Sequence, residues 1–209
     1  MPTAPDGAAR WDDDRMDRIK IELHDKLREV RAALLAKLDG LGEYDLRRPM
    51  TPTGTNLLGL VKHLAGLEYG YLGDALGRPA PEKMSWIEDE SIWQGADMWA
   101  APGESREYIT GLYARACAHA DQVITSLDLD APATVAHWPA SRRDTTLGFL
   151  LIRMAAETAQ HAGHADVVRE LIDGTGGPDH DMIDSATWQD YLTQVQAAAD
   201  HFADQAGPA

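Results

Sequence analysis

The sequence predicts an all-α protein, folded as a four-helix bundle whose helices run up, down, down and up. Four segments of about 20 residues or more carry apolar side chains at steps of three and four, the pattern of helices that bury one face. No segment reads convincingly as a strand. The connection over residues 78–103 is long enough to cross the domain, so the second and third helices are expected to run parallel.

The first two helices are bounded by a glycine and by capping residues. The first is expected from Asp14 to Gly40, because glycine readily ends a helix. Its stripe comprises Met16, Ile19, Leu23, Leu27, Val30, Leu34 and Leu38. The second is expected to begin at a cap on Thr55 or Asn56 and to run through Leu76.

The third and fourth helices show the same signals. Ser105 is expected to cap the third helix, whose stripe comprises Tyr108, Leu112, Ala116, Val123 and Leu127. The fourth is expected to start at Thr145 or Thr146, to run to about Ile172 and to end at Gly174.

Three parts of the chain follow from these boundaries. Residues 1–13 are expected to be a disordered leader, residues 14–175 the bundle, and residues 176–209 a C-terminal extension with a short helix over 185–202. The leader is polar and lacks the features of a signal peptide.

Composition narrows the class of partner. Lys and Arg total 19 against 34 Asp and Glu, a net charge of −15, which disfavours nucleic acids and anionic membranes. The single cysteine, Cys117, allows no disulfide within the chain, and no apolar run is long enough to span a membrane. We therefore expect a cytoplasmic protein that acts on a small molecule. The sequence is compatible with both a monomer and a homodimer.

The second and fourth helices carry residue types that bind divalent metal ions. Glu157 and His161 are four residues apart, so both lie on one helix face. His63 lies mid-way along the second helix, and its apolar neighbours Leu60 and Leu67 predict that it points inward. A carboxylate and two imidazoles on facing helices can hold one ion and leave coordination positions open.

Simpler interpretations of these residues also fit. A histidine on an apolar helix face can be a hydrogen-bonded core residue, and a Glu–His pair can be an exposed ion pair. His164 and Asp166 follow the pair; each is expected to contact the outer nitrogen of a ligand, to serve as a catalytic base, or to be exposed.

The long crossover contains three tryptophans, Trp86, Trp93 and Trp99. They are expected either to form a lid over the metal end or to anchor the crossover on the bundle. His137, in the loop before the fourth helix, is a further residue expected at the open end of the bundle.

Two motifs carry a family resemblance. Asn56-Leu-Leu-Gly-Leu-Val-Lys-His63-Leu and Ala156-Glu157-Thr-Ala-Gln-His161-Ala-Gly-His164-Ala-Asp166 resemble the DinB/YfiT-like superfamily of metal-binding helical bundles. The chain is most similar to the branch with mycothiol-dependent maleylpyruvate isomerase and the bacillithiol- or mycothiol-S-transferases. The resemblance implies that His63, Glu157 and His161 are the metal ligands. It assigns no basic residue to the thiol; the basic residues close in sequence are Arg78, Arg142, Arg143 and Arg153.

The function that this resemblance implies is thiol chemistry at a metal. We expect an S-transferase or isomerase that acts on a small electrophile with mycothiol or a similar low-molecular-weight thiol, with zinc or nickel bound. The segment after Gly174 is too short for the additional domain of the isomerase, which disfavours that activity. The alternatives are a non-catalytic bundle that binds a metal or small ligand, and a metal-assisted hydrolase.

Overall fold

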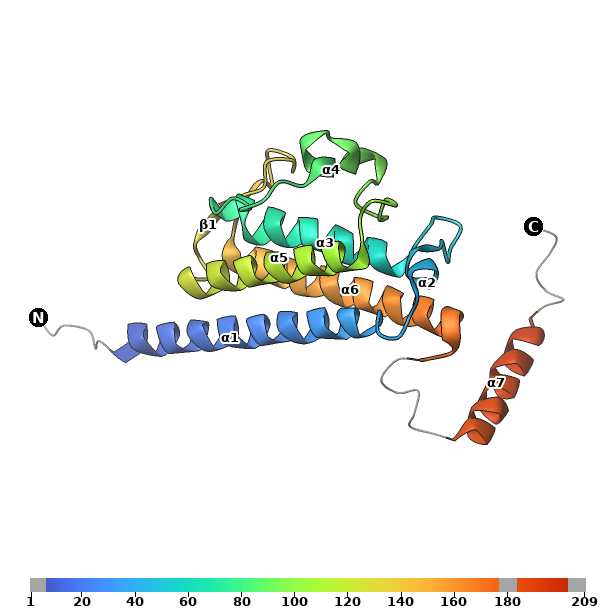
Figure 1. The fold of residues 1–209 in the computed structure, drawn as a ribbon. Coiled ribbons are helices and arrows are strands. Elements are labelled where there is room, and N and C mark those ends of the chain that lie inside the picture. The colour runs from blue at the N-terminus through green and yellow to red at the C-terminus, as the bar shows by residue number, and fades with distance from the viewer. Residues whose placement is uncertain (1–6, 177–183, 203–209) are drawn as a thin grey trace, which may run out of the picture.

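A computed structural model describes residues 7–176 and 184–202, and helices dominate it (Figure 1). The four long helices are α1 (Gly7–Ala36), α3 (Leu57–Leu72), α5 (Arg106–Ser126) and α6 (Leu147–Asp173). Helix α1 packs against α6, and α3 packs against both α5 and α6. The predicted all-α class is therefore confirmed.

Shorter elements connect and follow the long helices. They are α2 (Glu43–Arg47), the 3-10 helices η1 (Asp74–Leu76) and η2 (Ser91–Gln94), α4 (Ser85–Glu88), and α7 (Ser185–Asp200). Helix α1 begins at Gly7, inside the segment expected to be a leader. Residues 1–6 of that leader lie outside the described residues, as do 177–183 and 203–209 of the expected extension. None of the helices in the described ranges is long and apolar enough to cross a membrane.

Caps confirm the predicted starts of the second, third and fourth helices and the end of the fourth. The side chains of Asn56, Ser105 and Thr146 accept hydrogen bonds from backbone N–H groups three residues on, at the starts of α3, α5 and α6. Gly174 ends α6 in the left-handed conformation, with φ 77°. These caps fix where α3 and α6 begin, and so which side chains each presents to the other.

The second helix, expected to run through Leu76, ends at Leu72, because the chain turns at Gly73 into η1. The first helix ends at Ala36 rather than at Gly40.

The apolar stripe of α1 is only partly buried. Leu27, Leu34 and Leu38 are fully buried, whereas Met16 and Ile19 are exposed. The first turns of α1 extend past the other long helices (Figure 1). Tyr108, expected in the stripe of α5, is exposed as well.

The expectation of no strand was wrong. Strands β1 (Pro132–Thr134) and β2 (Asp144–Thr146) pair antiparallel, with Ala133 opposite Thr145. Each has three residues, too few for an alternating pattern to be recognised in the sequence. The hairpin leads directly into α6 and positions its intervening loop, residues 135–143, at one end of the bundle.

The crossover between η1 and α5 folds back along α3 (Figure 1). The buried ammonium of Lys62 donates to the carbonyls of Ala96 and Trp99, and the Asn56 amide donates to the carbonyl of Met98. Gly59 makes this approach possible, because a Cβ there would lie 1.9 Å from the Met98 carbonyl oxygen. Residues 96–99 are thereby fixed beside the middle of α3.

Candidate metal centre

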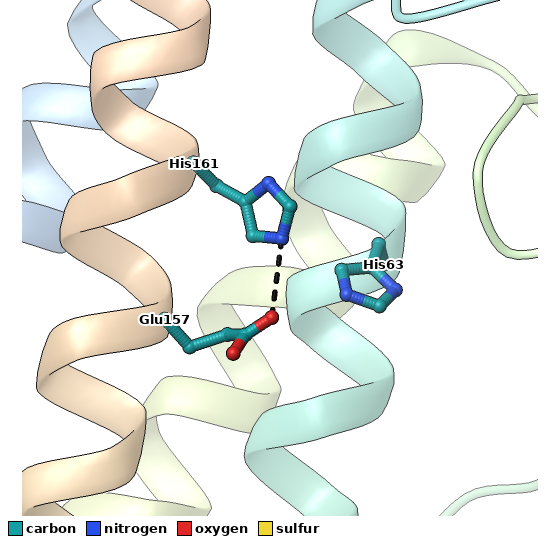
Figure 2. Close-up of side chains that lie close together, drawn as sticks. All are labelled: His63, Glu157 and His161. Atoms are coloured by element: carbon teal, nitrogen blue, oxygen red, sulfur yellow. Dashed lines mark ion pairs between the residues drawn. The ribbon is translucent and has the colours of Figure 1, made fainter. Parts of the chain in front are cut away.

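Three potential ligands face one another between α3 and α6. Figure 2 shows His63 on α3 pointing toward Glu157 and His161 on α6. One ligand atom of each lies within 4.8 Å of the others. An ion about 2.0–2.2 Å from each donor would need only small side-chain rotations to close that spacing.

The two helices set this geometry through simple periodicity. Glu157 and His161 are one helical turn apart on α6, and Glu157 Oε1 lies 3.4 Å from His161 Nε2 (Figure 2). His63 enters from the facing helix, with its ring centre 5.1 Å from that of His161. The side chains of His63, Glu157 and His161 are 17%, 25% and 12% exposed, so the centre is neither sealed in the core nor fully solvated.

The crossover supplies a carboxylate to the ring of His63. Asp97 is buried, and its Oδ2 lies 2.6 Å from His63 Nδ1. An ionised carboxylate can only accept, so Nδ1–H donates and Nε2 keeps its lone pair. Carboxylates hold metal-binding imidazoles in this manner, fixing both the tautomer and the ring orientation.

The surroundings of His161 favour its neutral form. Burial lowers the pKa of His161, and the neighbouring His63 ring lowers it further, against the opposing effect of Glu157. A neutral imidazole has a lone pair to give to a metal. Two imidazoles and one carboxylate form a donor set that suits a divalent ion, so this triad could hold a metal.

The two residues expected around the ligands lie in different places. His164 Nδ1 is 3.4 Å from His161 Nδ1, so His164 contacts the outer nitrogen of a candidate ligand. Asp166 instead forms an ion pair with Lys37 on the loop that follows α1, at 2.6 Å. That ion pair ties Asp166 to the chain near α1 and leaves His164 as the neighbour of the triad.

The tryptophans of the crossover separate into different environments. Trp86 is buried in the core, with Lys62 Nζ 4.2 Å from its ring centre. Trp99 is exposed, and its backbone carbonyl accepts from Lys62. Trp93 is exposed but contacts His137 of the hairpin loop, with ring centres 6.2 Å apart. Burial of Trp86 fits the anchor interpretation, and the contact of Trp93 fits the lid interpretation.

Sequence reasoning missed one residue of this centre. Asp97 is one of many acidic residues in the chain, and only the return of the crossover brings it to His63. Of the four basic residues named from the sequence, Arg153 lies one turn before Glu157, with its Nη2 4.0 Å from Glu157 Oε2.

Comparison with known proteins adds a family match. A family model described as "Mycothiol-S-transferase" matches residues 22–174, a range that contains the whole triad. Comparison with curated proteins finds no match.

Proposed function

The chain belongs to the mycothiol-S-transferase family, because the match covers well over half of its length, and we propose that it is a metal-dependent enzyme that transfers the thiol of mycothiol to a small electrophile. The triad of His63, Glu157 and His161 is the observation that carries this proposal. A family match and a donor set with open positions favour catalysis over a purely structural site.

The chain's own residues prepare the site for one ion and one thiol. Asp97 orients His63, burial keeps His161 neutral, and Glu157 adds one negative charge. Zinc or nickel would suit these donors, and when bound it would stabilise the thiolate form of the co-substrate sulfur, which is the nucleophilic form. The side chains of the three ligands are 12–25% exposed, so the triad is in contact with solvent.

The proposed reaction is a substitution at carbon. The sulfur of mycothiol forms a bond to the electrophilic carbon, the bond from that carbon to its leaving group breaks, and the thiol proton is released to water. With monochlorobimane the products are the thioether, chloride and a proton. No oxidant or reductant is needed.

The test is thioether formation from mycothiol and monochlorobimane, followed by fluorescence. The zinc- or nickel-loaded protein is expected to exceed both the metal-free protein and the spontaneous reaction. His63→Ala should reduce the rate to that of the metal-free protein. A wild-type rate equal to the spontaneous rate, with mycothiol and with several other thiols, would refute the proposal and favour a non-catalytic binding protein.

A metal-assisted hydrolase fits this site less well. That reaction needs a general base, and the candidates that follow the ligand pair on α6 are His164 and Asp166. Asp166 is engaged with Lys37, and His164 is exposed and contacts the outer side of His161. We therefore rank thiol transfer first.

We also propose the finer features expected from the sequence. The order up, down, down, up is supported by the return of the crossover and by the colour gradient along the long helices (Figure 1). A cytoplasmic location is supported by the single cysteine, because the reducing cytoplasm keeps both protein cysteines and small thiols in the reduced form. A homodimer is supported by the exposed apolar side chains Met16, Ile19 and Ile21 of α1.

A further inference from the structure

Beside the triad, Arg153 lies against two neighbouring aromatic rings, whose centres are 5.7 Å apart. Its guanidinium carbon lies 4.9 Å from the ring centre of Tyr71 on α3 and 5.3 Å from that of Trp138 in the hairpin loop. Cation–π contacts with these two rings restrict the orientation of the guanidinium. The orientation of the guanidinium plane, which carries the N–H donors of Arg153, is therefore restricted before a ligand binds.

The donors of Arg153 are mostly unused. Its buried Nε has no hydrogen-bond partner in the described part of the chain, and its closest acidic group is Glu157, at 4.0 Å. The Arg153 side chain is 37% exposed, so a ligand oxygen can reach the guanidinium N–H groups other than Nε from solvent. Because Glu157 belongs to the triad, such an oxygen would belong to a molecule bound at the metal centre.

Two loops extend this site away from the triad. His137 of the hairpin loop lies with its Nε2 3.4 Å from the Tyr71 hydroxyl, and Trp93 of η2 contacts His137 edge to face. Trp93 is 72% exposed, so most of its indole surface is free for a ligand. Burial and the charge of Arg153 lower the pKa of His137, so its ring is neutral and can donate as well as accept.

We propose that Arg153 and Trp93 form the subsite that binds the polyhydroxylated ring portion of the thiol co-substrate. Arg153 donates hydrogen bonds to oxygens of that portion, and the indole of Trp93 packs on the C–H face of a ring. An indole suits a polyhydroxylated ring, because its apolar face packs on C–H groups while its N–H can hydrogen-bond to a hydroxyl or to water. This inference rests on the proposed thiol transfer, and it names the residues that select mycothiol over a smaller thiol.

The test compares two thiols that differ in the ring portion. Isothermal titration calorimetry of the zinc-loaded protein gives the Kd of mycothiol and that of N-acetylcysteine, which has no ring. Trp93→Ala and Arg153→Lys are each expected to raise the Kd of mycothiol about tenfold. The first variant loses the indole that packs on the ligand ring, and the second loses the planar guanidinium that donates to its oxygens. The Kd of N-acetylcysteine should stay unchanged in Trp93→Ala. Trp99→Ala, an exposed tryptophan of the same crossover, is the matched control and should leave both values unchanged.

The outcomes separate this inference from the proposed function. If wild type transfers mycothiol and both variants bind it as tightly as wild type, the subsite is refuted and the proposed function stands. The same conclusion follows if wild type binds mycothiol and N-acetylcysteine equally. If wild type neither binds nor transfers mycothiol, both proposals are refuted. Exposure of Trp93 makes its variant the one expected to keep the wild-type melting temperature.

Discussion

Asp97 is predicted to strengthen metal binding through its contact with His63. The two groups meet at 2.6 Å, and Asp97 is only 5% exposed, so the bond is short, charge-assisted and poorly screened. Loss of a carboxylate behind a metal-binding histidine costs about 10–100-fold in affinity. That range corresponds to roughly 1.4–2.7 kcal/mol. Because of this burial, we expect Asp97→Ala near the upper end.

Asp97→Asn should have a smaller effect than Asp97→Ala. The amide still accepts from His63 Nδ1–H, but a neutral acceptor is about half as strong as a carboxylate, so we expect a loss of about tenfold. Zinc affinity is measured by competition with a chromophoric chelator, with circular dichroism as a check on folding. Glu88→Gln removes the same charge from an exposed position of the crossover and serves as the control. Equal zinc affinity in wild type and Asp97→Ala would refute the reasoning.

Three further predictions concern packing and titration. Gly59→Ala should force the crossover off α3, because the new Cβ would lie 1.9 Å from the Met98 carbonyl oxygen. We expect a lower free energy of unfolding in urea and a lower zinc affinity in the competition assay. An unchanged zinc affinity would contradict this prediction. Glu68→Gln should destabilise the bundle by about 3 kcal/mol in urea unfolding, the lower end of the range for breaking a buried pair, because Arg31 keeps a second acidic partner. Burial raises the pKa of the Cys117 thiol, so it should react slowly with Ellman's reagent at pH 8. Stability should also fall as the pH rises above about 8.5, because the unfolded thiol loses its proton first, and a pH-independent stability there would contradict the assignment.

Much of the fold could be predicted because local signals determine it. Caps at Asn56, Ser105 and Thr146 each depend on one side chain and the next turn of helix, so the sequence alone identifies them. Glu157 and His161 are brought together by helical periodicity in the same way. His63 required one further step, the packing of α3 on α6, which the apolar stripes predict only in outline.

The parts that could not be predicted depend on where a loop lies in space. Asp97 reaches His63 because Gly59 lets the crossover press against α3, and no periodicity records that contact. The same holds for Trp93, which meets His137 from a segment far away in sequence. The exposure of Met16 has a different cause: its helical pattern is real, but α1 is longer than the helices it packs against.

The most direct test of the metal centre is the number of metal ions bound per chain. Protein without a His tag is loaded with zinc, dialysed, and measured by plasma mass spectrometry beside His63→Ala and Glu157→Ala. We predict one ion per wild-type chain and none in either variant, with helical circular dichroism unchanged, because the apolar core holds the bundle without the metal. A wild-type chain that retains no zinc, or variants that retain one ion each, would contradict the assignment of the triad. Variants that unfold would show that the site is structural rather than open to substrate.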